Sequence, residues 1–387
     1  MIYADYNGSA PLTREVKDYL VKRLEKGPFA NPNAIHYLGS KTLMGMENAR
    51  SVCAKILGAD IPQVIFTSGA TEGITTVFHS VLSGINPQKD TKNTIVTCGL
   101  EHSAVINTAQ YHKSLGFDVH CIPVLENGQI DFQAFKTYMD NFHQKVAIVA
   151  VMAANNETGV IQPYNEINTV CQNYKVPYLC DTTQFIGKTE FHFKNSQIDY
   201  AVTSGHKLGA MTGTGILLAK EPTTLKALII GGGQEKGHRG GTQNYLGNET
   251  LAVALNTLPE LLKNIPTLSK KRDEFEAKVQ AAHPDVVIIG KNSPRLATTT
   301  YISYPGIHGQ AVQIELESND IFVTTSSACS DNMPVTSKVL KAMGVSDDVG
   351  RGVVRISLGL GADLATYDQL ADALIKAYDK LKKVKSY

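Results

Sequence analysis

Short apolar runs rich in β-branched residues alternate with longer amphipathic segments between residue 63 and about residue 220. The runs of strand length are residues 63–69, 93–99, 118–124, 146–154, 177–183, 200–207 and 214–220. Continuous apolar runs are typical of strands covered on both faces, and helix-length connections between them favour parallel neighbours. The pattern therefore predicts a doubly wound α/β domain with a mostly parallel sheet between helices.

The organisation changes after about residue 258. A long helical stretch over residues 248–282 leads to a second set of strand-like runs, at residues 285–290, 297–306, 320–327 and 353–359. Apolar residues then recur at three-and-four spacing along residues 364–383, which predicts a last amphipathic helix. We interpret this part as a smaller C-terminal α+β domain and expect the N-terminal segment to pack beside it.

Charge and hydropathy exclude some classes of partner. Among 387 residues, 37 Lys and Arg balance 36 Asp and Glu, so no basic surface for nucleic acid or an anionic membrane is indicated. The longest apolar run, residues 146–154, is about half of the ~20 residues that a membrane-spanning helix needs. The first residues include Asp5 and lack a basic region followed by an apolar run, so we expect no signal peptide. We predict a cytoplasmic protein that binds a small molecule or another protein.

The cysteines differ in their sequence surroundings. They stand at positions 53, 98, 121, 171, 180 and 329, without metal-site or disulfide-framework spacing. Cys98, Cys121 and Cys180 lie in strand-like runs, where we expect buried, unreactive thiols. Cys329 lies instead in "TSSACSDN", among small polar residues. Its surroundings are unlike those of a structural cysteine, which makes Cys329 the candidate for thiol chemistry.

Two segments have the features of a phosphate site and of a buried carboxylate. In "FTSGATEG" (66–73), a strand leads into a helix whose free N–H groups favour a phosphate; Thr71 adds its hydroxyl or simply caps the helix. In "PYLCDTTQFIG" (177–187), Asp181 follows an apolar strand and needs a partner. In a pyridoxal phosphate enzyme such a partner is the pyridinium nitrogen; the alternative is that Asp181 is a helix N-cap.

A third segment, "TSGHKLGAMTGTG" (203–215), places Lys207 at the end of a strand and before a Gly-rich stretch. A lysine at the carboxyl end of such a strand points into the crevice where open α/β sheets bind ligands. Desolvation there lowers the pKa of a lysine, which suits Schiff-base chemistry. The alternative is a solvated loop lysine. The order of the three segments along one sheet favours a pyridoxal phosphate site over the separate alternatives.

With these segments the chain resembles the cysteine desulfurases, which are fold type I pyridoxal phosphate enzymes of aminotransferase class V. The similarity covers essentially the whole chain and is closest to the group whose catalytic cysteine lies in a longer Ser-rich loop. The matching segments are "NPNAIHYLG", "FTSGATEG", "EHSAV", "NNETGVIQP", "DTTQFIGK", "SGHKLGAMTGTG", "GGGQEKGHRGGTQN", "SSAC" and "VRISLG". The resemblance implies a large cofactor-binding domain over residues 15–258. Residues 1–14 and 259–387 would form the small domain with the catalytic Cys loop.

The resemblance also implies roles for single residues around pyridoxal 5'-phosphate. Lys207 would hold the cofactor covalently, Asp181 would pair with the pyridine nitrogen and Gln184 with the phenolic oxygen. His102 would stack on the ring; without the resemblance it would be a surface histidine at a helix start. The phosphate would be bound by Thr71, Ser204, His206 and the backbone of Ala70.

Three further roles concern the substrate and a second subunit. Asn156, also close to the cofactor, and Arg355 would hold the substrate, since Arg suits a planar carboxylate. Thr242 in "HRGGT" would reach the phosphate of the neighbouring subunit, which implies a homodimer. Cys329 would be the nucleophile, in a loop whose small neighbours suit a thiol that must move between sites.

The implied reaction converts L-cysteine to L-alanine with a persulfide on Cys329. The sulfur would pass to an acceptor protein for iron–sulfur clusters, a thio-cofactor or tRNA thiolation. Selenocysteine lyase and cysteine sulfinate desulfinase are alternatives; a class V aminotransferase is disfavoured by "SSAC", because transamination needs no thiol. A non-catalytic partner in a sulfur-transfer assembly is disfavoured by the joint presence of Lys207, Asp181, His102 and Cys329.

The chain departs from the family pattern at two places. The family often has "DNNATT" near the N-terminus, where this chain has Gly8, Ser9 and Ala10. Close relatives often have a histidine where this chain has Ala153. Both places lie near the substrate pocket in the family. The departures therefore bear on the choice of substrate and the rate of reaction, and less on the fold or the cofactor.

Overall fold

The computed structural model describes residues 1–325 and 335–384. Its main sheet has the strand order β2-β8-β7-β6-β5-β3-β4. The strands are β2 (Val64–Thr67), β3 (Thr94–Cys98), β4 (Asp118–Ile122), β5 (Val146–Ala150), β6 (Tyr178–Asp181), β7 (Tyr200–Ser204) and β8 (Gly215–Ala219). Neighbouring strands are parallel except that β8 is antiparallel to β2 and β7. The mostly parallel α/β sheet is confirmed, and each of its strands lies inside a predicted run.

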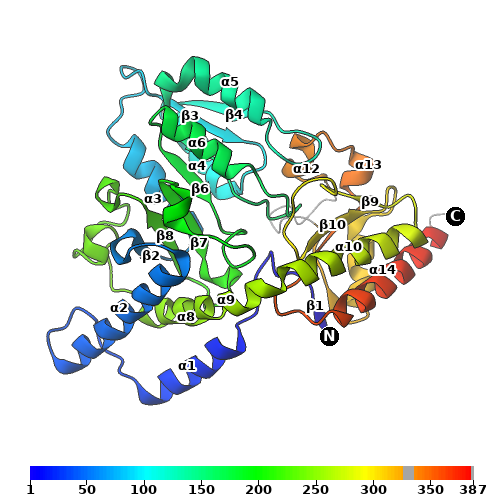
Figure 1. The fold of residues 1–387 in the computed structure, drawn as a ribbon, viewed down its shortest axis with the longest axis horizontal. Coiled ribbons are helices and arrows are strands. Elements are labelled where there is room, and N and C mark those ends of the chain that lie inside the picture. The colour runs from blue at the N-terminus through cyan, green and yellow to red at the C-terminus, as the bar shows by residue number, and fades with distance from the viewer. Residues whose placement is uncertain (326–334, 385–387) are drawn as a thin grey trace.

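Helices cover both faces of this sheet, at the upper left of Figure 1. Apolar residues of α3 (Ala70–Leu82) and α4 (Ser103–Ser114) form one core with one face. The other face packs against α2 (Tyr37–Leu57), α5 (Phe132–Phe142), α6 (Tyr164–Asn173) and α8 (Tyr245–Asn256). Burial on both faces explains why the strands are continuous apolar runs rather than alternating ones.

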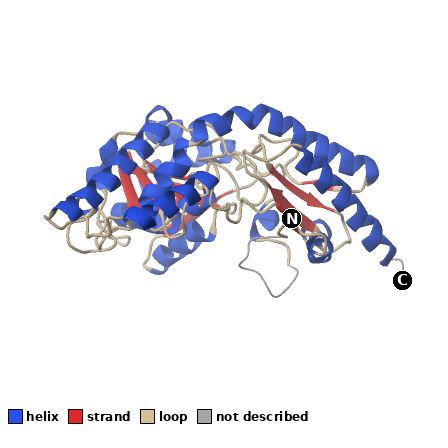
Figure 2. Ribbon diagram, turned by 90° about the horizontal axis from the view of Figure 1, so that it is seen from below, coloured by secondary structure: helices blue, strands red, loops and turns tan. Residues whose placement is uncertain are grey.

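A second group of strands lies beside the C-terminal helix, at the right of Figures 1 and 2. β10 (Thr299–Ser303) pairs antiparallel with β9 (Val287–Ile288) and β12 (Val353–Ser357). β1 (Ile2–Tyr3) pairs in parallel with β11 (Ile321–Phe322), so the N-terminal segment joins this part of the chain. A separate core, from Ala4 and residues 268–378, supports the domain boundaries at residues 14/15 and 258/259, which stay a prediction.

The remaining helices show one error in the sequence prediction. They are α1 (Arg14–Lys26), α7 (Phe193–Ser196), α9 (Leu258–Leu261), α10 (Ile265–Ala282), α11 (Gly309–Glu317), α12 (Lys338–Ala342), α13 (Asp347–Gly350) and α14 (Ala365–Val384). The stretch 248–282 is not one helix, because Pro259 and Pro266 each stand in the first turn of a new one. Proline lacks an N–H group and clashes with a preceding helical turn, so each proline starts a helix instead of continuing one. The predicted last helix is confirmed as α14.

The cysteine prediction is correct in part. Cys98 and Cys180 are buried in β3 and β6, as expected. Cys121 is exposed, and the expectation that it is buried is wrong. It lies on β4, the edge strand of the sheet, where one side has no neighbouring strand. No helix of the described residues combines the length and the apolar character needed to cross a membrane.

Candidate active site

Residues that follow β2, β6 and β7 meet at the carboxyl edge of the main sheet. Asp181 ends β6, Ser204 ends β7, and Lys207 closes the 3-10 turn that follows β7. Ala70 begins α3 shortly after β2, and its N–H donates to Ser204 Oγ at 2.8 Å. The three strands run in one direction, and open α/β sheets bind ligands at the edge where their carboxyl ends meet. The structure thus brings these residues together, and their roles remain predictions.

The start of α3 has the features of a phosphate cradle. Gly69 is the N-cap of this helix, so the alternative that Thr71 is a plain N-cap is wrong. Thr71 stands in the first turn with its side chain exposed, beside N–H groups that have no partner within the helix. A Cβ on Gly215 would lie 2.5 Å from Gly69 Cα, so β8 approaches this turn as closely as glycine permits. Amides and hydroxyls at a helix start suit a phosphate.

His206 lies next to this cradle, with Nδ1 3.3 Å from Ser9 Oγ. Burial first, and then the positive charge of Lys207, lowers the pKa of His206 to about 4. The imidazole is therefore neutral at neutral pH and carries one N–H donor. A neutral donor of this kind fits the predicted contact with phosphate.

Lys207 is the amine at the centre of the site. Its Nζ donates to the carbonyl oxygen of Asn7 at 2.7 Å and also to the carbonyl oxygen of Gly8. Burial first, and then the charge of Arg355, lowers the pKa of Lys207 to about 8. A lowered pKa leaves more of the amine neutral, which is the form that reacts with a carbonyl group. The alternative of a solvated loop lysine does not fit this environment.

The lowered pKa of Lys207 predicts a pH-dependent contribution to stability in the cofactor-free protein. Between about 8 and the usual value of 10.5, the unfolded chain binds a proton that the folded chain does not. Stability therefore rises with pH in this window. The free-energy cost of burying the protonated amine is complete below the window and absent above it. We expect the stability of wild type, relative to Lys207→Met, to increase across the window in urea unfolding. A difference that does not change with pH would contradict the pKa.

Asp181 is a buried carboxylate at the floor of the site. Its Oδ1 accepts from the N–H of Thr183 at 2.9 Å within a turn. No helix of the described chain begins here, so the helix N-cap alternative is wrong. The hydroxyl of Thr183, whose N–H binds Asp181, is buried and has no partner among the described residues. A buried carboxylate next to an unpartnered hydroxyl suits a bound polar group.

Arg355 lies across from Lys207, on β12. Its Nη1 donates to the carbonyl oxygen of Asn156 at 2.9 Å, and its Nη2 donates to Asp5 Oδ1 at 2.6 Å. Its Nε is buried without a partner among the described residues. A spare buried N–H on a held guanidinium suits a carboxylate ligand. Asn156 contributes its backbone oxygen here, so a contact of its side chain with substrate stays a prediction.

Comparison with known proteins places this site in a family. The family described as aminotransferase class-V matches residues 2–370. The chain belongs to this family. Cysteine desulfurase IscS of Dictyoglomus turgidum is 30% identical over 388 aligned residues, covering 100% of this chain and 96% of the relative.

Two solved structures extend the comparison to three dimensions. A structure described as a NifS-like protein is 30% identical, with a TM-score of 0.88 and coverage of 98% of this chain and 100% of the other. A structure of SspA in complex with cysteine is 27% identical, with a TM-score of 0.80 and coverage of 92% and 99%. The expected family, fold and cofactor class are confirmed: the protein is a pyridoxal phosphate-dependent enzyme.

The side chains of this class-V chain fit that cofactor. The α3 amides, Ser204 and His206 suit the phosphate, and Asp181 suits a protonated pyridine nitrogen. The unpartnered hydroxyl of Thr183, next to Asp181, is available to a polar ligand. Within the described residues, no group of three or more His, Cys, Asp or Glu side chains is arranged to hold a metal ion.

The departures from the family pattern have local physical reasons. A Cβ on Gly8 would lie 2.3 Å from Asp5 Oδ2, so glycine allows Asp5 to face Arg355. Ser9 contacts His206, as described above. Ala153 is fully buried and its N–H donates to the carbonyl oxygen of Asp181 at 2.9 Å, so a histidine here would displace its neighbours. These residues support the site but do not decide the substrate.

The roles of three further predicted residues, like those of the residues above, remain predictions. His102 is the exposed N-cap of α4, and its Nδ1 accepts from Ala104 N–H at 3.1 Å; this position agrees with a surface histidine as well as with ring stacking. Thr242 is exposed in the loop that follows the Gly-rich segment. Cys329 lies outside the described residues.

Two buried residues of the site, Asn7 and Lys188, were not predicted from the sequence. The carbonyl oxygen of Asn7 accepts from Lys207 Nζ at 2.7 Å and from Gln184 Nε2 at 2.9 Å. Its side-chain Oδ1 accepts from Lys188 Nζ at 2.6 Å. Lys188 closes the matched segment "DTTQFIGK", and a lysine within an otherwise apolar and small segment was the available signal.

Proposed function

We propose that the protein is a pyridoxal phosphate-dependent cysteine desulfurase that converts L-cysteine to L-alanine. The observation that carries the proposal is that Lys207, whose pKa is lowered, lies in one site with Asp181 and the α3 cradle. The unpartnered Nε–H of Arg355 lies opposite Lys207 in this site. The family supports it, and so does the likeness to a structure that was solved with cysteine. When bound, the cofactor withdraws electrons from the substrate carbon that carries the amine.

Each step has a residue of this chain to perform it. Lys207 holds the cofactor and then moves the α-proton of the substrate, while Asp181 keeps a proton on the pyridine nitrogen. Gln184 donates to the phenolic oxygen, and the α3 cradle with Thr71 and His206 holds the phosphate. His102 covers the ring, and Asn156 and Arg355 orient the substrate carboxylate.

Cys329 is the proposed sulfur acceptor. Its thiol attacks the substrate sulfur, so an S–S bond forms while the C–S bond breaks. The electrons of the broken C–S bond stay with carbon, which takes up a proton and becomes the methyl group of alanine. Cysteine and one protein thiol thus give alanine and one persulfide, with no external oxidant or reductant in this half-reaction.

The test compares substrates on one purified enzyme. Alanine should form from L-cysteine, with sulfide released when a reductant is present. Faster alanine formation from selenocysteine or cysteine sulfinate would favour the alternative lyase or desulfinase. A protein that does not become yellow with pyridoxal phosphate and forms no alanine would contradict the proposal and favour a non-catalytic partner.

A second copy of the chain is the proposed partner for an exposed apolar surface. This surface is formed by α1, α2, the segment between them and the loop of residues 229–243; Asn33 Nδ2 donates to Gln243 Oε1 at 3.2 Å and joins the two parts. Its exposed members include Leu24 (59%), Phe29 (55%), Ile35 (102%), Tyr37 (76%), Met44 (59%) and Ile230 (89%). Contiguous apolar exposure of this kind marks an interface.

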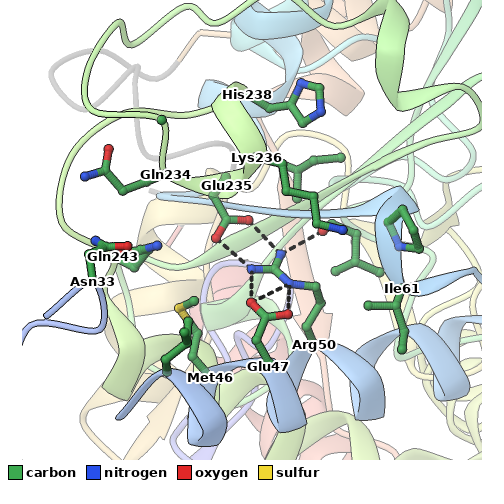
Figure 3. Close-up of a pocket in the computed structure, with 15 residues that line it drawn as sticks. Asn33, Met46, Glu47, Arg50, Ile61, Gln234, Glu235, Lys236, His238 and Gln243 are labelled. Carbon is green, nitrogen blue, oxygen red and sulfur yellow. Dashed lines mark hydrogen bonds and ion pairs between the residues drawn. The ribbon is translucent and has the colours of Figure 1, made fainter. Parts of the chain in front are cut away.

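The loop that carries Thr242 is fixed at its base, as Figure 3 shows. Arg50 Nη1 and Nη2 donate to Glu235 at 2.6 and 2.8 Å, and Arg50 also pairs with Glu47. The pair lines a cavity of about 230 Å³ next to the apolar surface. A held loop at an interface can present Thr242 to the phosphate of the neighbouring subunit, which supports shared active sites.

The dimer prediction is tested by charge at this surface. Ile35→Asp with Ile230→Asp should convert the dimer to a monomer in sedimentation velocity and reduce activity at least about tenfold, because buried carboxylates without partners oppose association. Ile314 is similarly exposed at 67% but lies on α11, so Ile314→Asp is the control and should remain dimeric. A wild-type monomer with full activity at low concentration would contradict the prediction.

The acceptor and the location complete the proposal. We propose that a sulfur-acceptor protein takes the persulfide sulfur for iron–sulfur cluster assembly or thiolation. The IscS name of the relative supports the first of these destinations. We also propose a cytoplasmic location, which is supported by the free state of the described cysteines, as in a reducing compartment.

A further inference from the structure

Lys188 is a buried amine beside Lys207, and no step described above uses it. Only 6% of its surface is exposed. Its Nζ donates to Gln184 Oε1 and, at 2.6 Å, to Asn7 Oδ1. Among the described residues, no carboxylate forms an ion pair with it. Buried lysines without a counter-ion are rare, so this one needs a reason.

The charge state agrees with these contacts. Burial first, and then the positive charges of Lys207 and Arg355, lowers the pKa of Lys188 well below its usual value of 10.5. This environment favours the neutral amine, which has two N–H groups. Gln184 Oε1 and Asn7 Oδ1 are two acceptors, so the donors and acceptors match in number.

The contact with Gln184 fixes which way its amide points. An amide side chain can turn over and exchange its oxygen and its NH₂ group. Lys188 offers N–H donors at one end of the amide, and at the other end Gln184 Nε2 donates to the carbonyl oxygen of Asn7 at 2.9 Å. A turned-over amide would place Oε1 against that carbonyl oxygen, acceptor against acceptor. The arrangement therefore keeps Oε1 on the Lys188 side and leaves the second N–H of Nε2 as a donor.

The contact with Asn7 fixes a second amide and extends to the substrate side. With Oδ1 held by Lys188, Asn7 Nδ2 donates to the carbonyl oxygen of Asn156 at 3.1 Å. That oxygen also accepts from Arg355 Nη1 at 2.9 Å. The backbone oxygen of Asn7 meanwhile accepts from Lys207 Nζ. One buried amine thus supports Gln184, Lys207 and Arg355 through short chains of hydrogen bonds.

We propose that Lys188 is a positioning residue that fixes Gln184 as a hydrogen-bond donor to the phenolic oxygen of the cofactor and holds Asn7 between Lys207 and Arg355. This inference rests on the proposed function, because it assigns Lys188 to the same cofactor site. Lys188 acts through its neighbours and touches neither cofactor nor substrate in this role.

The test is the pH dependence of the absorbance of the cofactor-loaded enzyme. In Lys188→Met the phenolic oxygen loses a fixed donor, so its anion is less stabilised and the midpoint of the absorbance change should rise by about one pH unit. Gln184→Met should produce the same rise. The double variant should show no larger rise than Gln184→Met alone, because the two residues act on one oxygen.

Lys194→Met is the matched control. Lys194 is a surface lysine that pairs with Asp60 at 2.6 Å, so the same chemical change there should leave the absorbance midpoint at the wild-type value. If Lys188→Met does not fold, Lys188→Gln takes its place: its amide can present either an oxygen or an NH₂ group to Gln184, so it no longer fixes that side chain, and the midpoint should again rise.

Two results would overturn the inference. A purely structural Lys188 would give lower thermal stability with an unchanged absorbance midpoint. Independent action would make the shifts of the two single variants add in the double variant. Both differ from failure of the proposed function, in which wild type itself would bind no cofactor or form no alanine from L-cysteine.

Discussion

Cys329→Ser is expected to bind pyridoxal phosphate and to change its absorbance with L-cysteine, yet to form alanine at least about 1,000-fold more slowly than wild type. The reason is that cofactor binding and α-proton movement depend on Lys207 and Asp181, whereas C–S cleavage needs a thiol to receive the sulfur. Serine replaces sulfur by oxygen and cannot form a persulfide. Alanine formation in a single turnover, with the absorbance spectrum beside it, measures both steps.

Cys121→Ser is the matched control for this experiment. Cys121 is exposed, and it lies on the edge strand β4, separated from β6 and β7 by β3 and β5. We expect wild-type alanine formation from this variant. Cys180→Ser should instead lower stability, because it places a hydroxyl in the core. If Cys329→Ser turns over L-cysteine at the wild-type rate with reductant present, Cys329 is not the acceptor and the enzyme expels sulfide directly.

Lys207→Ala is expected to lose the borohydride-reducible cofactor adduct and at least about 1,000-fold of the activity, since it removes both the covalent attachment and the base. The hydrogen bonds from Lys207 Nζ to the carbonyl oxygens of Asn7 and Gly8 disappear as well, so the N-terminal segment loses one tie to the site. Peptide mapping of wild type after borohydride reduction should find the label on Lys207.

The second buried lysine makes this mapping informative. Both lysines donate hydrogen bonds to Asn7, Lys188 to its side-chain oxygen and Lys207 to its backbone oxygen. The other contact of Lys188 is with Gln184 Oε1. Lys188→Met should therefore retain the label on Lys207. A label on Lys188 in wild type would show that the roles of the two lysines are exchanged and would overturn both assignments.

Much of the sheet and part of the site followed from the sequence. Strands such as β5 and β7 are buried on both faces, and their residues are therefore apolar without interruption, which is a local signal. Asp181 and Lys207 were predicted at the carboxyl ends of strands of one sheet, which favoured a shared site, whereas Ser204 came from the resemblance. The resemblance added roles that no spacing could supply, such as those of Cys329 and Thr242.

Other features depended on contacts that no local window contains. Cys121 is exposed on β4, at one end of the strand order, although its own run looks like that of the buried Cys98. The breaks at Pro259 and Pro266 were visible in the sequence and were outweighed by the helical pattern around them.

The sequence by itself determined the alternation of strands and helices, and with it the carboxyl edge of the sheet at which Asp181 and Lys207 lie. Only the tertiary structure decided what surrounds them. Asn7 contacts Gln184 across 177 residues of sequence and Lys207 across 200, because β1 pairs with β11 and carries the N-terminal segment over the carboxyl edge of the main sheet. Burial of Lys188 and the lowered pKa of Lys207 arise from that long-range packing, since both depend on removal from water by residues that are distant in the chain.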